Sequence, residues 1–316
     1  MGADLPDEAD VPPDGRADRR GDQTGSGQTA RRPGGSEAET RSRQECYDEL
    51  RVAEARQQSV AARRIAAEEQ AASDTWNEKA TESRWMWTEY QRKWPPEERK
   101  PSGRPDDSPG TWHGEGNRVL EPADNDRVEA ECDRIAERER DKISPAMRAV
   151  ESQDPDRHLV GFDDRRKDRD RIKEKVYDKI KEFVDFSPEQ AVSSVSDTIR
   201  YTFSYQEAHY TQGVWSDIGL LKEQGFELHT VKNSWSKDQY KGINSQWIEP
   251  DSGQRFEVQF HTLISYEAKQ LTHDAYERLR THQADKFEQM VLEAFQKKVS
   301  ADVAIPPGAA DIPDYS

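Results

Sequence analysis

The seven residues RFEVQFH, at positions 255–261, alternate polar and apolar side chains without interruption. A period of two places Phe256, Val258 and Phe260 on one face of a β-strand and the polar residues on the other face. Such a strand needs a core against its apolar side, so the chain must contain a sheet with at least one buried face. The polar side is either the lining of a groove or the exposed side of an ordinary half-buried strand.

Only part of the chain has the composition of a folded core, because the 316 residues are 32% hydrophobic and 35% charged. Residues 1–42 are poor in apolar side chains, which predicts a disordered leader. Residues 43–94 are rich in Ala, Glu, Arg and Gln, which predicts a long helical arm. Pro, Gly, Ser and charges indicate a linker at 95–118. A folded domain at 119–300 and a flexible tail at 301–316 complete the expected organisation.

Aromatic residues gather at the C-terminal end of the predicted arm. Trp87, Tyr90 and Trp94 are three and four residues apart, which places them on one side of a helix. The full set is Trp76, Trp85, Trp87, Tyr90 and Trp94. Such a stripe is more often a packing face than a cofactor site, and a protein partner bound through the arm is one expectation.

The order of the predicted elements is that of an α+β protein, with a small mixed β-sheet flanked by helices. Alternation and turn residues predict strands at 197–204, 226–233, 244–249 and 254–261, the last two joined as a hairpin. Helices are expected at 123–142, 161–183, 210–224 and 264–299. Ser144 and Pro145 have the residue types of a cap and a first helical position, so a further helix is expected to begin there.

Charge and hydropathy limit the partners. A formal charge of -16 opposes general binding to nucleic acid, so any phosphate site must be local. No apolar run approaches the roughly 18 residues of a membrane-spanning helix, and the acidic start lacks the features of a signal peptide. A cytoplasmic protein without membrane contact is expected. Cys46 and Cys132 fit neither a disulfide framework nor a zinc site.

Two further segments carry candidate binding residues. Lys167, Arg171 and Lys175 are four residues apart and lie along one helix face, where they could hold a polyphosphate. Interleaved aspartates allow intrahelical ion pairs instead. In the loop at 233–244, Trp235 is expected to be an exposed aromatic suited to base stacking, and a glycine allows close approach to a ligand. A tight hairpin explains the same loop residues.

Together these segments resemble the synthetase domain of the RelA/SpoT family, the alarmone synthetases of the nucleotidyltransferase superfamily. The resemblance covers about residues 160–281. RRKDRDRIKEK (165–175) resembles the helix motif Arg-x-Lys-x-x-x-Ser-Ile-x-x-Lys, SDTIRYTF (196–203) the metal-carboxylate strand, QYKGINSQW (239–247) the loop Gly-Tyr-Arg-Ser-x-His, and FEVQFHT (256–262) the strand Glu-x-Gln-x-Arg-Thr. His273 and Tyr276 match a His-x-x-Tyr on the following helix.

The chain departs from the family pattern mainly on the acceptor side. Lys241, Gly242 and Asn244 stand where the family loop has Arg, Ser and His, and His261 stands where the last strand has Arg. The metal-carboxylate Asp197 precedes an arginine by three positions instead of five, which keeps it on the same strand face. The resemblance therefore defines the reaction better than the acceptor.

The resemblance implies transfer of the β,γ-pyrophosphate of ATP to the 3′-hydroxyl of GDP, GTP or an adenine nucleotide, or to the 3′ end of tRNA. Asp197 and Glu257 would bind Mg²⁺, Glu257 would also act as the base, and Gln259 would orient the hydroxyl. The implied phosphate ligands are Arg165, Lys167, Lys175, Arg200 and His261. The implied acceptor ligands are Tyr240, Lys241 and Asn244.

The first 150 residues contain one histidine, His113, so the His-Asp cluster of the family's hydrolase half is not expected. A synthetase-only chain with a polar leader would suit a toxin-like effector delivered into a target cell. The alternative is a degenerate synthetase-like domain that binds nucleotide or a protein partner without catalysis. Replacements in the loop and at His261 favour that alternative, whereas retention of Asp197 and Glu257 speaks against it.

Overall fold

The computed structural model describes residues 37–95, 109–280 and 284–316. The chain divides into two compact units, Met1–Ser59 and Val60–Ser316. Residues 1–36 of the expected leader lie outside the described residues. All of the strands and the candidate site belong to the second unit.

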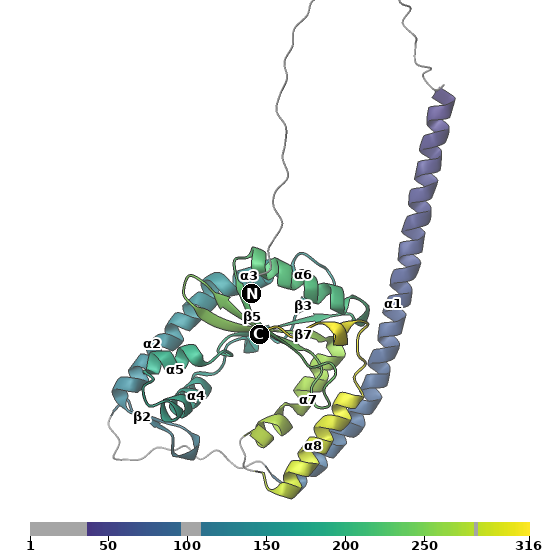
Figure 1. Cartoon of the computed structure of the whole chain (residues 1–316). Coiled ribbons are helices and arrows are strands. Elements are labelled where there is room, and N and C mark those ends of the chain that lie inside the picture. Colours follow the sequence, from purple (N-terminus) through teal and green to yellow (C-terminus); the bar gives the residue numbers. More distant parts are fainter. Residues whose placement is uncertain (1–36, 96–108, 281–283) are drawn as a thin grey trace, which may run out of the picture. The chain divides into compact units, whose positions relative to one another are not determined.

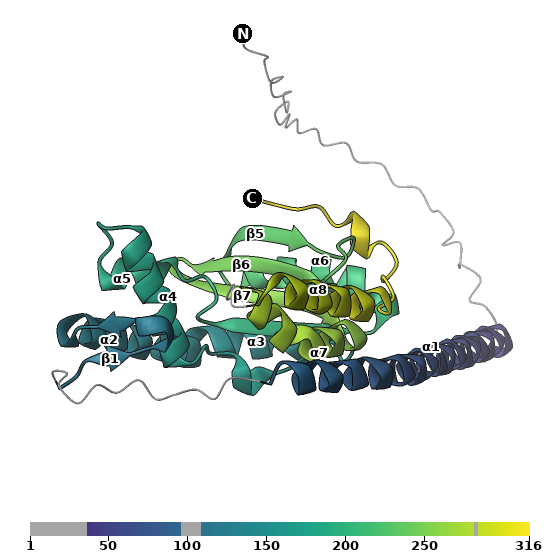
Figure 2. The same ribbon diagram turned by 90° about the horizontal axis from the view of Figure 1, so that it is seen from below.

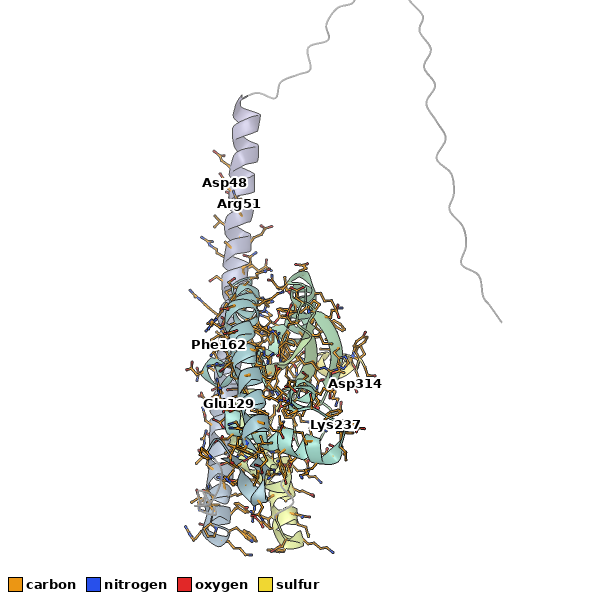
Figure 3. All side chains as sticks on the ribbon, turned by 90° about the vertical axis from the view of Figure 1, so that its left-hand side faces the viewer. Asp48, Arg51, Glu129, Phe162, Lys237 and Asp314 are labelled. Carbon is orange, nitrogen blue, oxygen red and sulfur yellow. The ribbon has the colours of Figure 1, made fainter. Side chains whose placement is uncertain are left out.

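The predicted arm is a single helix, α1 (Glu37–Lys93), which begins in the first unit and ends in the second. Between residues 45 and 60 the described side chains are exposed, and Figure 3 labels Asp48 and Arg51 among them. The helix is long but highly charged. In the part of the chain that the structure covers, no helix combines the length and the apolar content needed to cross a membrane.

A five-stranded mixed sheet forms the centre of the second unit (Figure 1). The strands, in spatial order, are β3 (His158–Leu159), β4 (Arg200–Tyr205), β7 (Gln254–Thr262), β6 (Ile243–Glu249) and β5 (Glu227–Asn233). β4 and β7 are parallel, and every other neighbouring pair is antiparallel. The predicted α+β class and the β6–β7 hairpin are confirmed. Asp197, expected on a strand, instead lies three residues before β4.

Helices cover both faces of this sheet (Figure 2). Tyr210 at the start of α6 donates a hydrogen bond from its hydroxyl to the carbonyl of Phe260, on the apolar face, whereas α7 contacts the polar face. The helices after α1 are α2 (Pro122–Arg138), α3 (Ser144–Glu151), α4 (Arg169–Glu182), α5 (Pro188–Ser194), α6 (Tyr210–Glu223), α7 (Leu263–Arg280) and α8 (Lys286–Ala301). The single helical run expected at 264–299 is therefore two helices.

Ser144 does not cap a new helix. A π-helical turn, Glu139–Ile143, joins α2 to α3, and Ser144 itself has helical dihedral angles. The Ser144 side chain is instead engaged by the carboxylate of Glu139, which is only 1% exposed and needs hydrogen-bond donors. The Ser144 hydroxyl donates to it, and the hydroxyl of Tyr201 donates at 3.0 Å.

The aromatic stripe of α1 packs against the chain's own α7 and α8. Trp76 is 3% exposed and donates from Nε1 to Glu267 on α7 at 2.6 Å. The hydroxyl of Tyr90 donates to Glu288 on α8 at 2.7 Å, and the ring of Trp87 stacks on that of Phe295 with centroids 5.3 Å apart. Four residues of the stripe expected to bind a protein partner thus contact the chain's own helices, whereas Trp85 is exposed.

Two segments expected to be loose contain regular structure. Residues 96–108 of the predicted linker lie outside the described residues, but near its end β1 (Trp112–His113) pairs with β2 (Val119–Leu120), the first residues of the predicted domain. In the predicted tail, Ala309 and Ile312 are buried, and Tyr315 exchanges two backbone hydrogen bonds with Val231. The tail binds because β5 is an edge strand whose outward backbone groups need partners.

We expect Trp87→Ala to lower the free energy of unfolding by about 2 kcal/mol, because it removes the ring contacts that join α1 to α8. Trp85→Ala is the matched control, since Trp85 is 63% exposed, and it should change stability by less than about 0.5 kcal/mol. Urea denaturation followed by circular dichroism measures both. Equal losses in the two variants would contradict the packing of α1 on α8.

Candidate functional site

Polar side chains from the three central strands share one face of the sheet. The register places Arg200 opposite Glu257, and Gln259 opposite both Thr202 and Asn244. With a period of two, the residues on this face are Arg200, Thr202 and Ser204 from β4, Glu257, Gln259 and His261 from β7, and Asn244 and Gln246 from β6. We call this set the polar face.

The side chains of the polar face become more buried from the Glu257 end toward His261. Arg200 and Glu257 are half-buried, whereas Gln259 and His261 are buried beneath α7. The expected separation of polar and apolar sides in β7 is confirmed, but only the Glu257 end is open to a ligand.

Asp197 lies beside this open end and binds two lysines. Nζ of Lys175 is 2.7 and 2.8 Å from the two carboxylate oxygens, and Nζ of Lys167 is 3.1 Å from one of them. Burial by itself would raise the pKa of Asp197, but the two ammonium groups outweigh it and hold that pKa below its usual value. Asp168 caps the start of α4 and so fixes the helix that carries Lys175.

Glu257 is the second carboxylate of the site. Burial raises its pKa, and the charge of Asp197 adds to that effect, while Arg200 opposes it. The Gln259 amide donates a hydrogen bond to the Glu257 carboxylate. The structure therefore brings together the predicted residues Lys167, Lys175, Asp197, Arg200, Glu257 and Gln259.

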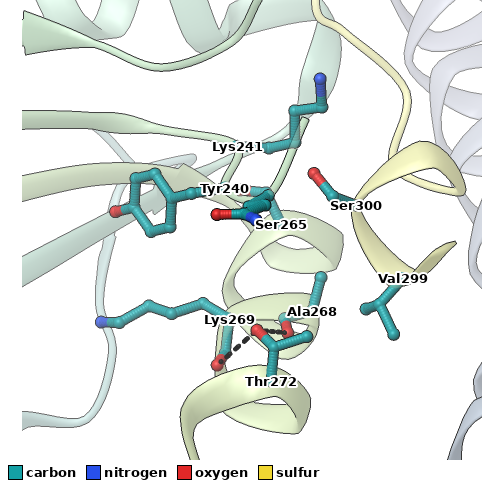
Figure 4. Close-up of a pocket in the computed structure, with 9 residues that line it drawn as sticks. Tyr240, Lys241, Ser265, Ala268, Lys269, Thr272, Val299 and Ser300 are labelled. Carbon is teal, nitrogen blue, oxygen red and sulfur yellow. Dashed lines mark hydrogen bonds between the residues drawn. The ribbon is translucent and has the colours of Figure 1, made fainter. Parts of the chain in front are cut away.

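The sequence analysis missed Lys269, on α7. Its Nζ lies 2.5 Å from Oε1 of Gln259, and Figure 4 shows its amine pointing to the same side as the Tyr240 hydroxyl. Burial lowers the pKa of Lys269 to about 8, and Arg200 adds to the shift, while Glu257 opposes it. The sequence shows only that Lys269 follows Ser265 by four residues and so shares its helix face. That this face is turned toward β7 is seen in the structure, where Ser265 contacts His261.

His261 is not placed to bind phosphate. Its side chain is fully buried, with Nδ1 2.8 Å from the Ser265 hydroxyl and Nε2 2.8 Å from the Tyr240 hydroxyl. Burial lowers the pKa of the imidazole well below its usual value, so the ring is neutral near pH 7. The neutral, enclosed imidazole does not bind an anion. It bonds to Tyr240 and so stabilises the loop that carries this residue.

The other predicted acceptor residues are also engaged within the loop. Tyr240 donates from its hydroxyl to Oδ1 of Asn244 at 2.7 Å. Lys241 donates to the carbonyls of Trp235 and Lys237 at 2.9 and 2.7 Å, and its amine points away from Lys269 (Figure 4). Trp235, expected to be an exposed platform, is fully buried.

The pocket drawn in Figure 4, beside Tyr240, has a volume of about 10 Å³. Ligand sites usually enclose several hundred cubic ångströms. In this conformation it has no room for a nucleotide base.

Arg165 belongs to the opposite side of β4. Its Nε lies 2.6 Å from the buried Glu139 carboxylate, and its Nη1 donates to the Phe162 carbonyl at 3.0 Å. Glu139 also accepts from Tyr201, whose ring is on the apolar face of the sheet. The structure therefore does not bring Arg165 to the polar face, where it was expected to bind phosphate.

Asp197 and Glu257 are the residues of this site that could hold a magnesium ion together with a phosphate group. Mg²⁺ is usually held by one or two carboxylates together with substrate phosphates and water. Over residues 37–95, 109–280 and 284–316, no three His, Cys, Asp or Glu residues are grouped as a complete metal site. A metal here would take its other ligands from the substrate.

Neither a protein-family model nor a curated protein matches this sequence. Solved structures similar to this chain include small alarmone synthetase 1 from Bacillus subtilis, at 13% identity and a TM-score of 0.37, over 56% of this chain and 91% of that one. A GTP pyrophosphokinase family protein from Streptococcus pneumoniae is similar at 13% identity and a TM-score of 0.36, over 56% and 86%. The B. subtilis protein bound to its product pppGpp is similar at 12% identity and 0.29, over 40% and 67%.

We expect Gly242→Ala to destabilise the protein by roughly 1–3 kcal/mol. Gly242 has φ of 153°, and an added Cβ would lie 2.7 Å from Cε1 of His261 and 3.1 Å from the carbonyl oxygen of Phe260. The control is Gly219→Ala in α6, where a Cβ meets no heavy atom within 4 Å. It should be neutral or stabilising by up to about 1 kcal/mol. Thermal unfolding of both variants is the measurement, and a Gly242→Ala protein as stable as the control would show that the loop does not press against His261.

Proposed function

We propose that this chain transfers pyrophosphate from ATP to the 3′-hydroxyl of a nucleotide, or of a tRNA 3′ end. The observation that carries the proposal is the pair Asp197 and Glu257 among the cations Lys167, Lys175 and Arg200. The sequence motifs that resemble alarmone synthetases supply these same residues. Phosphoryl-type transfer depends mostly on positioning and charge stabilisation, which is what such a set provides.

The two lysines would bind the triphosphate. In the free protein their ammonium groups neutralise Asp197, and a bound triphosphate would offer them a second set of oxygens. Mg²⁺ held between Asp197, Glu257 and the phosphates would neutralise charge on the transferred group. Arg200, opposite Glu257 on the neighbouring strand, would be the third cation.

Glu257 would accept the proton of the attacking hydroxyl. Burial raises its pKa in the free protein, and its place beside Arg200 and Asp197 puts it at the open end of the polar face. Gln259 donates to the same carboxylate and would keep it oriented toward the acceptor. The Tyr240 ring is half-buried and would stack on the acceptor base only if the loop moved.

A second candidate function is nucleotide or protein binding without turnover. It is favoured by the engagement of Lys241, Asn244 and His261 in bonds within the protein. Calorimetry separates the two, because binding of ATP without its consumption supports this candidate and Mg²⁺-dependent loss of ATP excludes it. A cytoplasmic location, and a toxin-like role in a target cell, stay predictions of the sequence.

The direct test incubates the full chain with ATP labelled in the γ-phosphate, Mg²⁺, and GDP, GTP, ADP, ATP or tRNA in turn. We expect label at the 3′ position of one acceptor, and loss of the reaction when Mg²⁺ is removed with EDTA. If none of these acceptors and no component of a cell extract becomes labelled, the proposed activity is wrong.

We expect Glu257→Gln to lower turnover by about 10²-fold or more, because the amide cannot accept the hydroxyl proton and carries no charge for a metal. Stability should change by less than about 0.5 kcal/mol, which thermal unfolding would check. Glu227→Gln on β5 is the matched control, because Glu227 is exposed and far along the sheet from Glu257. Equal turnover in wild type and Glu257→Gln would exclude the assigned role.

Glu249, on the strand next to β7, would not serve as a control for Glu257→Gln. Its buried carboxylate accepts hydrogen bonds from Lys142 and from the Ser252 backbone at 2.8 and 3.0 Å, and so holds the β6–β7 turn. A substitution there would test stability and not the reaction.

A further inference from the structure

The cations on the polar face differ from those expected. The position expected to supply a phosphate-binding charge holds His261, which is buried and neutral. Lys269 reaches the same face from α7 and ends at Gln259, the neighbour of Glu257. We propose that Lys269 is a positioning residue that fixes Gln259 and thereby Glu257 in the reactive arrangement. This inference rests on the proposed function and adds a residue to it.

The orientation of the Gln259 amide follows mainly from its close contacts with Lys269 and Glu257. An ammonium group can only donate hydrogen bonds, and an ionised carboxylate can only accept them. The Lys269 ammonium therefore selects the Gln259 carbonyl oxygen, at 2.5 Å, and leaves the amide nitrogen to donate to Glu257. The Thr202 hydroxyl also lies 3.4 Å from this oxygen, a longer contact than that of Lys269. Without Lys269 the Gln259 oxygen would keep only this long contact, and the amide that bonds to Glu257 would be less firmly fixed.

Partial burial of the Lys269 ammonium group costs desolvation free energy, so a packing role alone does not account for its position. Its ammonium is half-buried, and no carboxylate among the described residues forms an ion pair with it. The groups that face it are Gln259 and Glu257 on β7, Arg200 on β4 and the ring of Tyr266, 5.3 Å from Nζ. A partly desolvated lysine bonded to a neutral amide beside a carboxylate and an arginine is a candidate functional group.

The experiment compares Lys269→Met and Lys269→Arg with wild type. Methionine keeps the length of the side chain and removes the charge, whereas arginine retains a donor for the Gln259 oxygen. Lys297→Met on α8 is the control, because Lys297 is exposed on a helix outside the site. Thermal unfolding verifies that each variant is folded before it is compared.

The first readout needs no activity. In protein labelled with ¹⁵N-glutamine, the side-chain amide signal of Gln259 is assigned by its absence in Gln259→Leu. We expect this signal to shift in Lys269→Met, to return toward its wild-type position in Lys269→Arg, and to be unchanged in Lys297→Met. An unchanged Gln259 signal in folded Lys269→Met overturns the proposal, whether or not the protein has the proposed activity.

The second readout uses the acceptor identified by the labelling assay. We expect kcat of Lys269→Met to fall about 10-fold or more, with KM for ATP within about twofold, because orientation at the reacting end is lost while triphosphate binding is kept. Lys269→Arg should recover most of the rate. A rise in KM for ATP at unchanged kcat would instead make Lys269 a triphosphate ligand and overturn the positioning role.

Discussion

The parallel pairing of β4 with β7 is the constraint on which the candidate site depends. It sets Arg200 beside Glu257, two residues that are far apart in the sequence, and it brings the segment before β4, with Asp197, to the same end of the sheet. Parallel strands cannot be joined by a tight turn, so the intervening chain forms α6, β5 and β6 and packs around the pair. Glu257 is therefore held by a core strand, and Asp197 by the turn that leads directly into β4.

The same pairing divides the sheet into two unlike faces. Aromatic and aliphatic side chains of β4 and β7 pack beneath α6, and this apolar burial stabilises the domain. On the other face, α7 covers polar side chains, which must then bond one another because water is excluded. Ser265, His261 and Tyr240 form such a chain of contacts, and Lys269, Gln259 and Glu257 form another.

Local patterns in the sequence were enough for much of the fold. Strict alternation predicted β7, turn residues predicted the β6–β7 hairpin, and the helix expected at 210–224 is α6, which Gly225, with φ of 87°, follows. These predictions succeeded because they depend on backbone periodicity and turn chemistry, which act between near neighbours. The shared helix face expected for Lys167, Arg171 and Lys175 was wrong, because Lys167 precedes α4 and Arg171 pairs with Glu174, although Lys167 and Lys175 both reach Asp197.

The sequence by itself thus determined the α+β class, most strands and the identity of the residues around Asp197 and Glu257. Only the tertiary structure decided that His261 and Trp235 are buried, that Arg165 forms an ion pair with Glu139, and that Lys269 forms a hydrogen bond with Gln259. It also decided that the aromatic stripe and the C-terminal tail pack within the second unit. The physical reason is that period and spacing fix the face on which a side chain lies, whereas the element that covers that face comes from far along the chain.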